Sequence, residues 1–177
     1  MAKIPRSVKI LLVVQLLAFF SLPAAAADFR VGSATTVNKF NDLVYHHVDL
    51  AFPVDRGGGA WSPTAWTAGI GVFERNEDTS SVYTFGPVWR FEDSRRGFVE
   101  AAFSLTYLGH PRFRDENGGR DDFGQHLQFM SRLSLGMYLD RAQNWSADAG
   151  FMHVSNGGLS ETNPGADFFS LEMRVAY

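Results

Sequence analysis

Apolar and polar residues alternate along most of the chain beyond residue 28. The clearest case is the segment 97–108, where apolar residues recur at every second position: Val99, Ala101, Phe103, Leu105 and Tyr107. Glu100 and Thr106 are among the residues between them. A period of two places successive side chains on opposite faces of a β-strand. Because no segment of useful length has a helical period, the sequence predicts an all-β fold.

Eight such segments follow one another, separated by short clusters of Gly, Pro, Asn and Asp. Their predicted ranges are 29–37, 42–53, 64–74, 81–92, 97–108, 122–138, 144–156 and 166–177. An even number of strands of about 9–11 residues is typical of bacterial outer-membrane barrels. The predicted fold is therefore an eight-stranded antiparallel transmembrane β-barrel over residues 28–177. A barrel this narrow is filled by its own side chains and is no pore.

The main alternative concerns which face points inward. In a soluble sandwich or a lipocalin-like carrier, the apolar face would form the core. Three features favour the inverted arrangement: aromatic residues at the strand ends, polar faces with charges of both signs, and a chain end that alternates strictly from Phe169 to Tyr177. In that arrangement five charged residues are expected to form interior ion pairs: Arg90, Glu100, Arg132, Glu172 and Arg174.

The composition fits this arrangement as an average over two unlike faces. Of the 177 residues, 45% are hydrophobic and 20% are charged, and an oily exterior with a charged interior gives such an average. No stretch after the N-terminal segment approaches the roughly 18 apolar residues of a spanning helix. The lack of cysteine argues against a small disulfide-stapled fold. A formal net charge of −3 offers nucleic acid no basic face.

Residues 1–27 have the pattern of a secretory signal peptide. Lys3, Arg6 and Lys9 form a basic region, an apolar run covers 10–22, and small residues suited to cleavage occupy 25–27. The apolar run is shorter than the about 20 residues that span a bilayer, which disfavours a retained membrane anchor. Cleavage after Ala27 would leave a mature chain that starts at Asp28.

The seventh predicted strand interrupts the apolar exterior. Its outward row is Trp145, Ala147, Ala149 and Phe151. The same parity continues to His153 and Ser155, and the outward row of the eighth strand extends back to Asp167. With a periplasmic N-terminus, these three groups lie at the extracellular end of the lipid-facing surface. Since polar groups cost only about 0–1 kcal/mol near the interface, an accidental polar girdle is the alternative to a catalytic site.

A serine, a histidine and an acid on one face are the residue types of a nucleophilic hydrolase. His153 could take the proton of Ser155, and the acid would stabilise the imidazolium. The two residues are about 6.5–7 Å apart along the strand, so a bent side chain or a local twist must close the gap. The backbone N–H groups of Gly157 and Gly158 and the Asn156 amide are candidate oxyanion donors.

The stretch FMHVSNGGL at 151–159, followed by Asn163 and Asp167, resembles the motif of the outer-membrane lipid A 3-O-deacylases of the PagL type. The resemblance is specific over 151–177 and architectural before that. It implies a Gram-negative outer-membrane barrel that hydrolyses the ester-linked acyl chain at position 3 of lipid A, in the lipopolysaccharide of the outer leaflet. Neither a metal nor a cofactor is implied.

The same resemblance implies a role for each site residue. It assigns His153 and Ser155 as catalytic residues and Asp167 as the catalytic acid. Asn156 and Gly158 are assigned as the residues that bind the oxyanion. The family's acid is usually Glu, and Asp is shorter by one methylene group. Either the strand register compensates for the shorter side chain, or Glu161 in the adjacent loop is the working acid.

Two questions stay open on the sequence alone. In a non-enzymatic small outer-membrane barrel, with an adhesion or membrane-stability role, His153 and Ser155 would be ordinary rim residues. The long outer loop at 109–121 holds Arg112, Arg114 and Arg120, which could bind lipid A phosphates. Acidic residues lie beside these arginines, so a loop that pairs its own charges is the favoured alternative. The oligomeric state is not indicated.

Overall fold

The computed structural model describes residues 27–37, 40, 42–55, 62–94, 96–115 and 119–176. Eight antiparallel strands form a closed barrel in the order β1-β10-β9-β8-β5-β4-β3-β2. Their bounds are β1 Asp28–Thr36, β2 Val44–Pro53, β3 Ala65–Arg75, β4 Asp78–Ser94, β5 Gly97–Leu108, β8 Leu127–Tyr138, β9 Trp145–Ser155 and β10 Ala166–Ala176. The eight-stranded prediction is therefore confirmed. Apart from Ala27, the predicted signal peptide lies outside the described residues.

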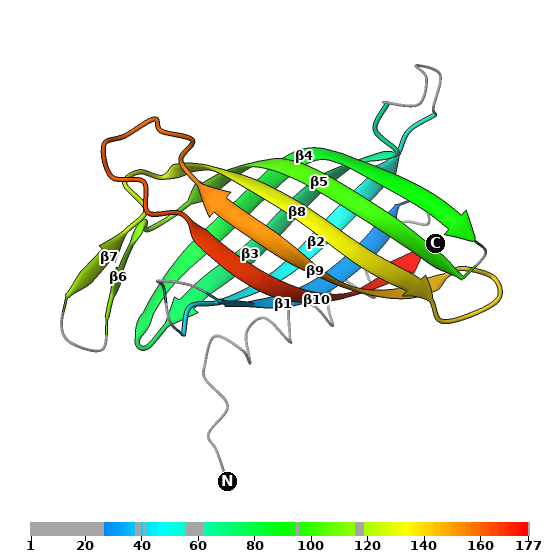
Figure 1. Cartoon of the computed structure of the whole chain (residues 1–177), viewed down its shortest axis with the longest axis horizontal. Coiled ribbons are helices and arrows are strands. Elements are labelled where there is room, and N and C mark those ends of the chain that lie inside the picture. The colour runs from blue at the N-terminus through cyan, green and yellow to red at the C-terminus, as the bar shows by residue number, and fades with distance from the viewer. Residues whose placement is uncertain are drawn as a thin grey trace, which may run out of the picture.

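The two ends of the barrel differ in what they carry. A separate hairpin, β6 Arg112–Arg114 and β7 Arg120–Asp122, lies at the same end as the connection between β9 and β10 (Figure 1). The C-terminal end of β10 lies at the opposite end. Among the described residues, no helix has the length and apolar character to cross a membrane.

The exterior of the barrel is apolar, as the inverted arrangement predicts. Alternate residues are exposed along most strands, and the large ones are mostly hydrophobic, with Leu135 69% and Leu171 58% exposed; the outward row of β2 is only partly exposed. Residues of the other parity, including Arg90 and Glu100, are buried. A continuous exposed band of this kind is unsuited to water and suited to lipid. The lipocalin-like alternative, which needs the apolar face inside, is therefore wrong.

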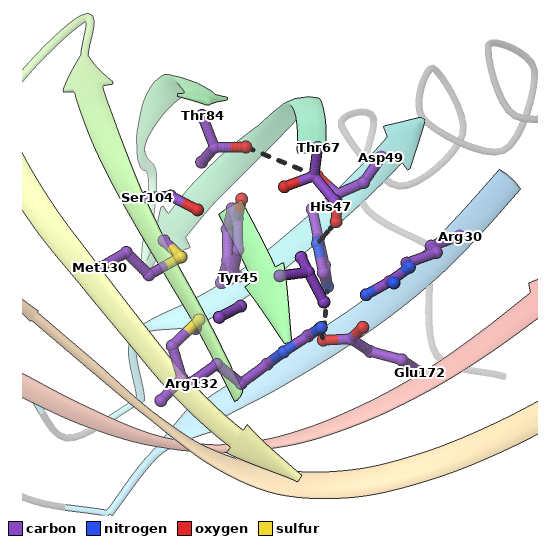
Figure 2. A pocket seen from close by; sticks show the side chains of 13 residues that line it. Arg30, Tyr45, His47, Asp49, Thr67, Thr84, Ser104, Met130, Arg132 and Glu172 are labelled. Atoms are coloured by element: carbon purple, nitrogen blue, oxygen red, sulfur yellow. Dashed lines mark hydrogen bonds and ion pairs between the residues drawn. The ribbon is translucent and has the colours of Figure 1, made fainter. Parts of the chain in front are cut away.

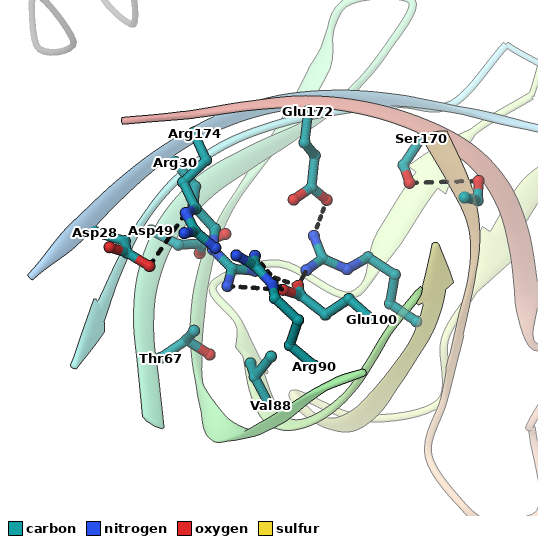
Figure 3. A network of polar contacts seen from close by, with 12 residues as sticks. Asp28, Arg30, Asp49, Thr67, Val88, Arg90, Glu100, Ser170, Glu172 and Arg174 are labelled. Atoms are coloured by element: carbon teal, nitrogen blue, oxygen red, sulfur yellow. Dashed lines mark hydrogen bonds and ion pairs between the residues drawn. The ribbon is translucent and has the colours of Figure 1, made fainter. Parts of the chain in front are cut away.

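Charged side chains fill the middle of the interior. Glu100 is fully buried and accepts hydrogen bonds from the guanidinium groups of Arg30, Arg90 and Arg132 (Figure 3). Arg132 also pairs with Glu172, and Arg174 pairs with Asp28. The predicted interior ion pairs are confirmed, since each of the five charged residues has an opposite charge beside it.

An apolar layer and a small cavity complete the interior. Buried rings pack at the end that carries the β6–β7 hairpin, with Phe73 stacked on Phe168 at 5.5 Å between centroids. Between this layer and the ion pairs lies a cavity of about 30 Å³, whose lining includes His47, Asp49 and Arg132 (Figure 2). Such a volume holds about one or two water molecules.

The segment before β8 departs from the prediction. In the sixth predicted strand, 122–138, alternation with Leu133 and Leu135 predicts Phe123 on the lipid face, but β8 begins only at Leu127. Gly124 has a φ of +85° and breaks the extended backbone. Phe123 is instead 1% exposed and stacks on Phe40 inside the barrel, at 4.6 Å between centroids. The hairpin β6–β7 was also not predicted, because its strands have only three residues each.

Charges of the outer loop are paired partly with each other and partly with the β3–β4 hairpin, where Arg75 pairs with Asp121. Arg112 Nε lies 2.7 Å from Asp122 Oδ2, and Arg114 Nη2 lies 2.8 Å from Asp78 Oδ1. The side-chain and backbone hydrogen bonds from Arg114 lower the pKa of Asp78 to about 2. Arg120 is exposed and has no ion-pair partner among the described residues. Arg112 thus pairs locally, as the self-paired loop predicts, whereas Arg114 pairs with β4, and both arginines already have a carboxylate in place of a phosphate.

Candidate active site

The polar break in the oily exterior lies at the end of β9, where the sequence places it. Phe151 is 64% exposed, and His153 and Ser155 follow on the same outward face. His153 is exposed and Ser155 is partly buried. Both residues lie near the barrel end that carries the β6–β7 hairpin, because β9 ends at Ser155.

Strand register brings Asp167 to His153. The two residues are direct partners in the antiparallel pairing of β9 and β10. His153 Nδ1 lies 2.7 Å from Asp167 Oδ1, and the two side chains are 50% and 49% exposed. An ionised carboxylate can only accept, so Nδ1 donates the hydrogen bond, and Nε2 of the neutral ring carries the lone pair. A histidine held in this tautomer can act as a base at Nε2.

The direct register also explains how Asp167, which is shorter than Glu, can reach His153. Because Asp167 stands opposite His153, one methylene group is enough for its carboxylate to reach Nδ1. Glu161 is exposed in the β9–β10 connection and forms no hydrogen bond or ion pair with a described residue. The geometry therefore favours Asp167 over Glu161 as the partner of His153.

The Asn156 side chain is directed into the β9–β10 connection. Asn156 is fully buried, and its Nδ2 donates to the carbonyl oxygens of Phe123 and Thr162 at 3.1 and 2.6 Å. Its Oδ1 accepts the N–H of Gly158 at 2.9 Å. The predicted oxyanion donors at Asn156 and Gly158 are thus occupied within the loop. Asn156 shapes the connection, because its amide satisfies backbone groups of two separate segments.

A family model described as lipid A 3-O-deacylase (PagL) matches residues 34–176, which include the strands and the loop that form this site. The chain belongs to the PagL family of lipid A 3-O-deacylases.

Relatives of this PagL-family chain show how far the similarity extends. The lipid A deacylase PagL of Pseudomonas aeruginosa (strain PAO1) is 28% identical over 115 residues, which make up 62% of this chain and 62% of that protein. The crystal structure of the outer membrane enzyme PagL has a TM-score of 0.63 at 21% identity, covering 84% of this chain and 98% of that one.

A structural neighbour with a different name shares the same barrel. The N-terminal β-barrel domain of Pseudomonas aeruginosa OprF has a TM-score of 0.53 at 8% identity, covering 86% of this chain and 97% of that one. The barrel is a scaffold, so function has to be argued from the site that it carries.

Two residues beside the site of this PagL-family chain have no role in the sequence-based prediction. Asn163 is exposed, and its Oδ1 accepts the N–H of Asn156 at 3.0 Å, directly after Ser155 in the chain. Its Nδ2 has no partner among the described residues. Ser131 on β8 is exposed and is the register partner of His153 on the side away from β10. Each had one signal in the sequence: Asn163 follows the family motif, and Ser131 interrupts an apolar row.

Within the described ranges, no three His, Asp or Glu side chains are arranged to hold a metal ion. The site contains a histidine paired with a carboxylate, a partly buried serine at 155, an exposed serine at 131 and the Asn163 amide.

Proposed function

We propose that this chain is a lipid A 3-O-deacylase of the Gram-negative outer membrane, which hydrolyses the ester-linked acyl chain at position 3 by serine-type acyl transfer. The hydrogen bond between His153 and Asp167, on the outward face that also carries Ser155, is the observation that carries this proposal. Family membership and the names of its relatives support the substrate and the location. We also propose that residues 1–27 direct export as a cleaved signal.

The position of the pair restricts the class of substrate. His153 and Asp167 are on the outside of the barrel wall, whereas the interior cavity is lined by residues of the opposite parity such as Met152. A substrate that reaches Nε2 of His153 must therefore approach from the surrounding membrane. A lipid ester near the outer surface satisfies this requirement, because its carbonyl lies close to the headgroup.

Each of the three residues has its own part in the proposed reaction. Ser155 attacks the ester carbonyl carbon while His153 Nε2 takes its hydroxyl proton, and Asp167 stabilises the imidazolium that forms. The tetrahedral intermediate then breaks its bond to the sugar oxygen, which receives the proton from His153. Water, deprotonated by the same Nε2, releases the fatty acid from Ser155 in the second half of the reaction.

The oxyanion donors need a revised assignment. The Asn163 amide is anchored through Oδ1 to the backbone beside Ser155, and its Nδ2 is free to donate. We assign Asn163 as one donor. The N–H of Gly158 could serve as the second donor only if it exchanged the Asn156 oxygen for the substrate oxygen. One such donor supplies about 2.7–4 kcal/mol of transition-state stabilisation in other hydrolases.

A non-enzymatic role in adhesion or membrane stability has less support. The family matched by this chain is named for an enzyme, and a structural role would not need the Nδ1 of an exposed histidine to be held by a carboxylate.

Expression in a Gram-negative host whose lipid A keeps its 3-linked chains should give lipid A that is lighter by one hydroxyacyl chain. Mass spectrometry of lipid A from cells with the chain and with the empty vector makes the comparison. An unchanged spectrum, with the folded protein present in the outer-membrane fraction, would rule out the proposed activity.

Replacing Asp167 by Ala should lower the deacylation rate by about 10²-fold, less than removal of the nucleophile, because the imidazolium loses its carboxylate but Nε2 keeps its lone pair. The rate is measured with purified protein in detergent. Glu161→Ala is the matched control and should keep the wild-type rate. If Glu161→Ala loses activity and Asp167→Ala does not, the acid has been assigned wrongly.

A further inference from the structure

The proposed mechanism requires Nε2 of His153 to reach Ser155 along the strand. The two residues are two positions apart on β9, so their Cα atoms are about 6.5–7 Å apart along the strand. The Nδ1 of His153 is also hydrogen-bonded across the strands to Asp167 on β10. For Nε2 to act on Ser155, the imidazole must extend along the barrel surface toward the level of Ser155.

Gly165 occupies the place beside Ser155. In the pairing of β9 with β10, Asp167 stands opposite His153 and Ala166 opposite Val154. Continued by one residue, this register puts Gly165 next to Ser155. A Cβ atom built on Gly165 would lie 3.0 Å from Cε1 and 3.6 Å from Nε2 of His153. The imidazole therefore occupies the space that a side chain at position 165 would need.

Two further facts describe this contact. Gly165 is buried although it lies at the barrel surface, next to the exposed His153. Its φ is +61°, in the left-handed region that favours glycine. Glycine at this position thus serves the backbone turn into β10 and also leaves room for the ring.

We infer that Gly165 is a positioning residue of the deacylation reaction, because its missing side chain lets the His153 imidazole lie over the start of β10 at the level of Ser155. The inference rests on the proposed function. A methyl group at 165 would press against Cε1, the ring carbon between the two nitrogens. The ring must then shift by a few tenths of an ångström, which disturbs its hydrogen bond to Asp167 or its approach to Ser155. Misplacement of a catalytic group by about 1 Å can cost about 10²-fold in rate.

The test uses two substitutions that separate the ring contact from backbone strain. Gly165→Ala and Gly165→Asn both introduce a Cβ atom, but Asn tolerates a positive φ far better than Ala. If the contact with the imidazole matters, kcat should fall at least tenfold in both variants, while KM stays within twofold, because the ring is displaced and the lipid surface is unchanged. Pro164→Ala, in the same exposed segment, is the matched control and should keep the wild-type kcat.

Folding of each variant is followed by the heat-induced mobility shift of the barrel in gel electrophoresis. The inference is overturned if both variants keep the wild-type kcat, or if Ala loses activity and Asn does not, since strain would then be the cause. It is also overturned if both variants lose the folded band, because the effect would be structural. An inactive wild type would refute the proposed function itself, and that result is visible in the wild-type arm alone.

Discussion

Ser155→Ala should leave lipid A intact, with the rate of 3-O-deacylation reduced by at least about 10³-fold, because loss of the nucleophile removes the acyl-enzyme route. His153 and Asp167 would keep their hydrogen bond, because this contact does not involve Ser155. Mass spectrometry of lipid A from cells that express each variant, together with rates of purified protein, measures the effect.

The structure provides a demanding control for this experiment. Ser131 is a second serine on the lipid face, is exposed, and is the direct cross-strand partner of His153. Such a relation brings Cβ atoms within about 4.5–5.5 Å. Ser131→Ala should retain nearly the wild-type rate, because the motif and the oxyanion candidate Asn163 both adjoin Ser155. If Ser131→Ala were inactive and Ser155→Ala active, the nucleophile would be on β8.

The second large effect is a loss of stability when Glu100 is replaced. Glu100→Ala should lower the free energy of unfolding by about 3–5 kcal/mol, because removing one partner leaves buried charges uncompensated. Here the change removes the carboxylate that Arg30, Arg90 and Arg132 share, and leaves Arg132 with Glu172. Denaturant titration of the barrel in detergent, followed by tryptophan fluorescence, measures the loss.

Glu92→Gln is the matched control for Glu100→Ala. Glu92 is exposed, and its carboxylate accepts a hydrogen bond from Tyr138 Oη at 2.7 Å, so its replacement should change stability by less than about 1 kcal/mol. Folded Glu100→Ala protein should still deacylate lipid A, because the ion pairs lie inside the wall and His153 lies outside it. Equal stability of the two variants would contradict this prediction and would mean that water solvates the interior arginines in place of Glu100.

The face of each side chain was predictable from the sequence because a strand has a period of two. The outward position of His153 and Ser155 follows from their spacing to Trp145 and Phe151 in the same strand, with no knowledge of the partner strands. The same local rule identified Asp167 as outward and Glu100 as inward. The eight strands and the inverted barrel followed from repetition of this pattern.

Contacts between distant segments were decided only by the tertiary structure. Phe123 continues the alternation of β8, yet it turns inward because Gly124 breaks the strand and aromatic partners such as Phe40, far away in the sequence, are inside. The Asn156 amide has the chemistry of an oxyanion donor. Its role in the loop depends on the carbonyl oxygen of Phe123, 33 residues away.

The sequence by itself determined the barrel, the direction of its faces and the strand that carries the polar break. The tertiary structure decided which acid meets His153 and that the imidazole lies against Gly165. The reason is that strand parity is a property of one strand, whereas register belongs to two. The pairing of β9 with β10 sets Asp167 opposite His153, and no spacing within either strand specifies that alignment.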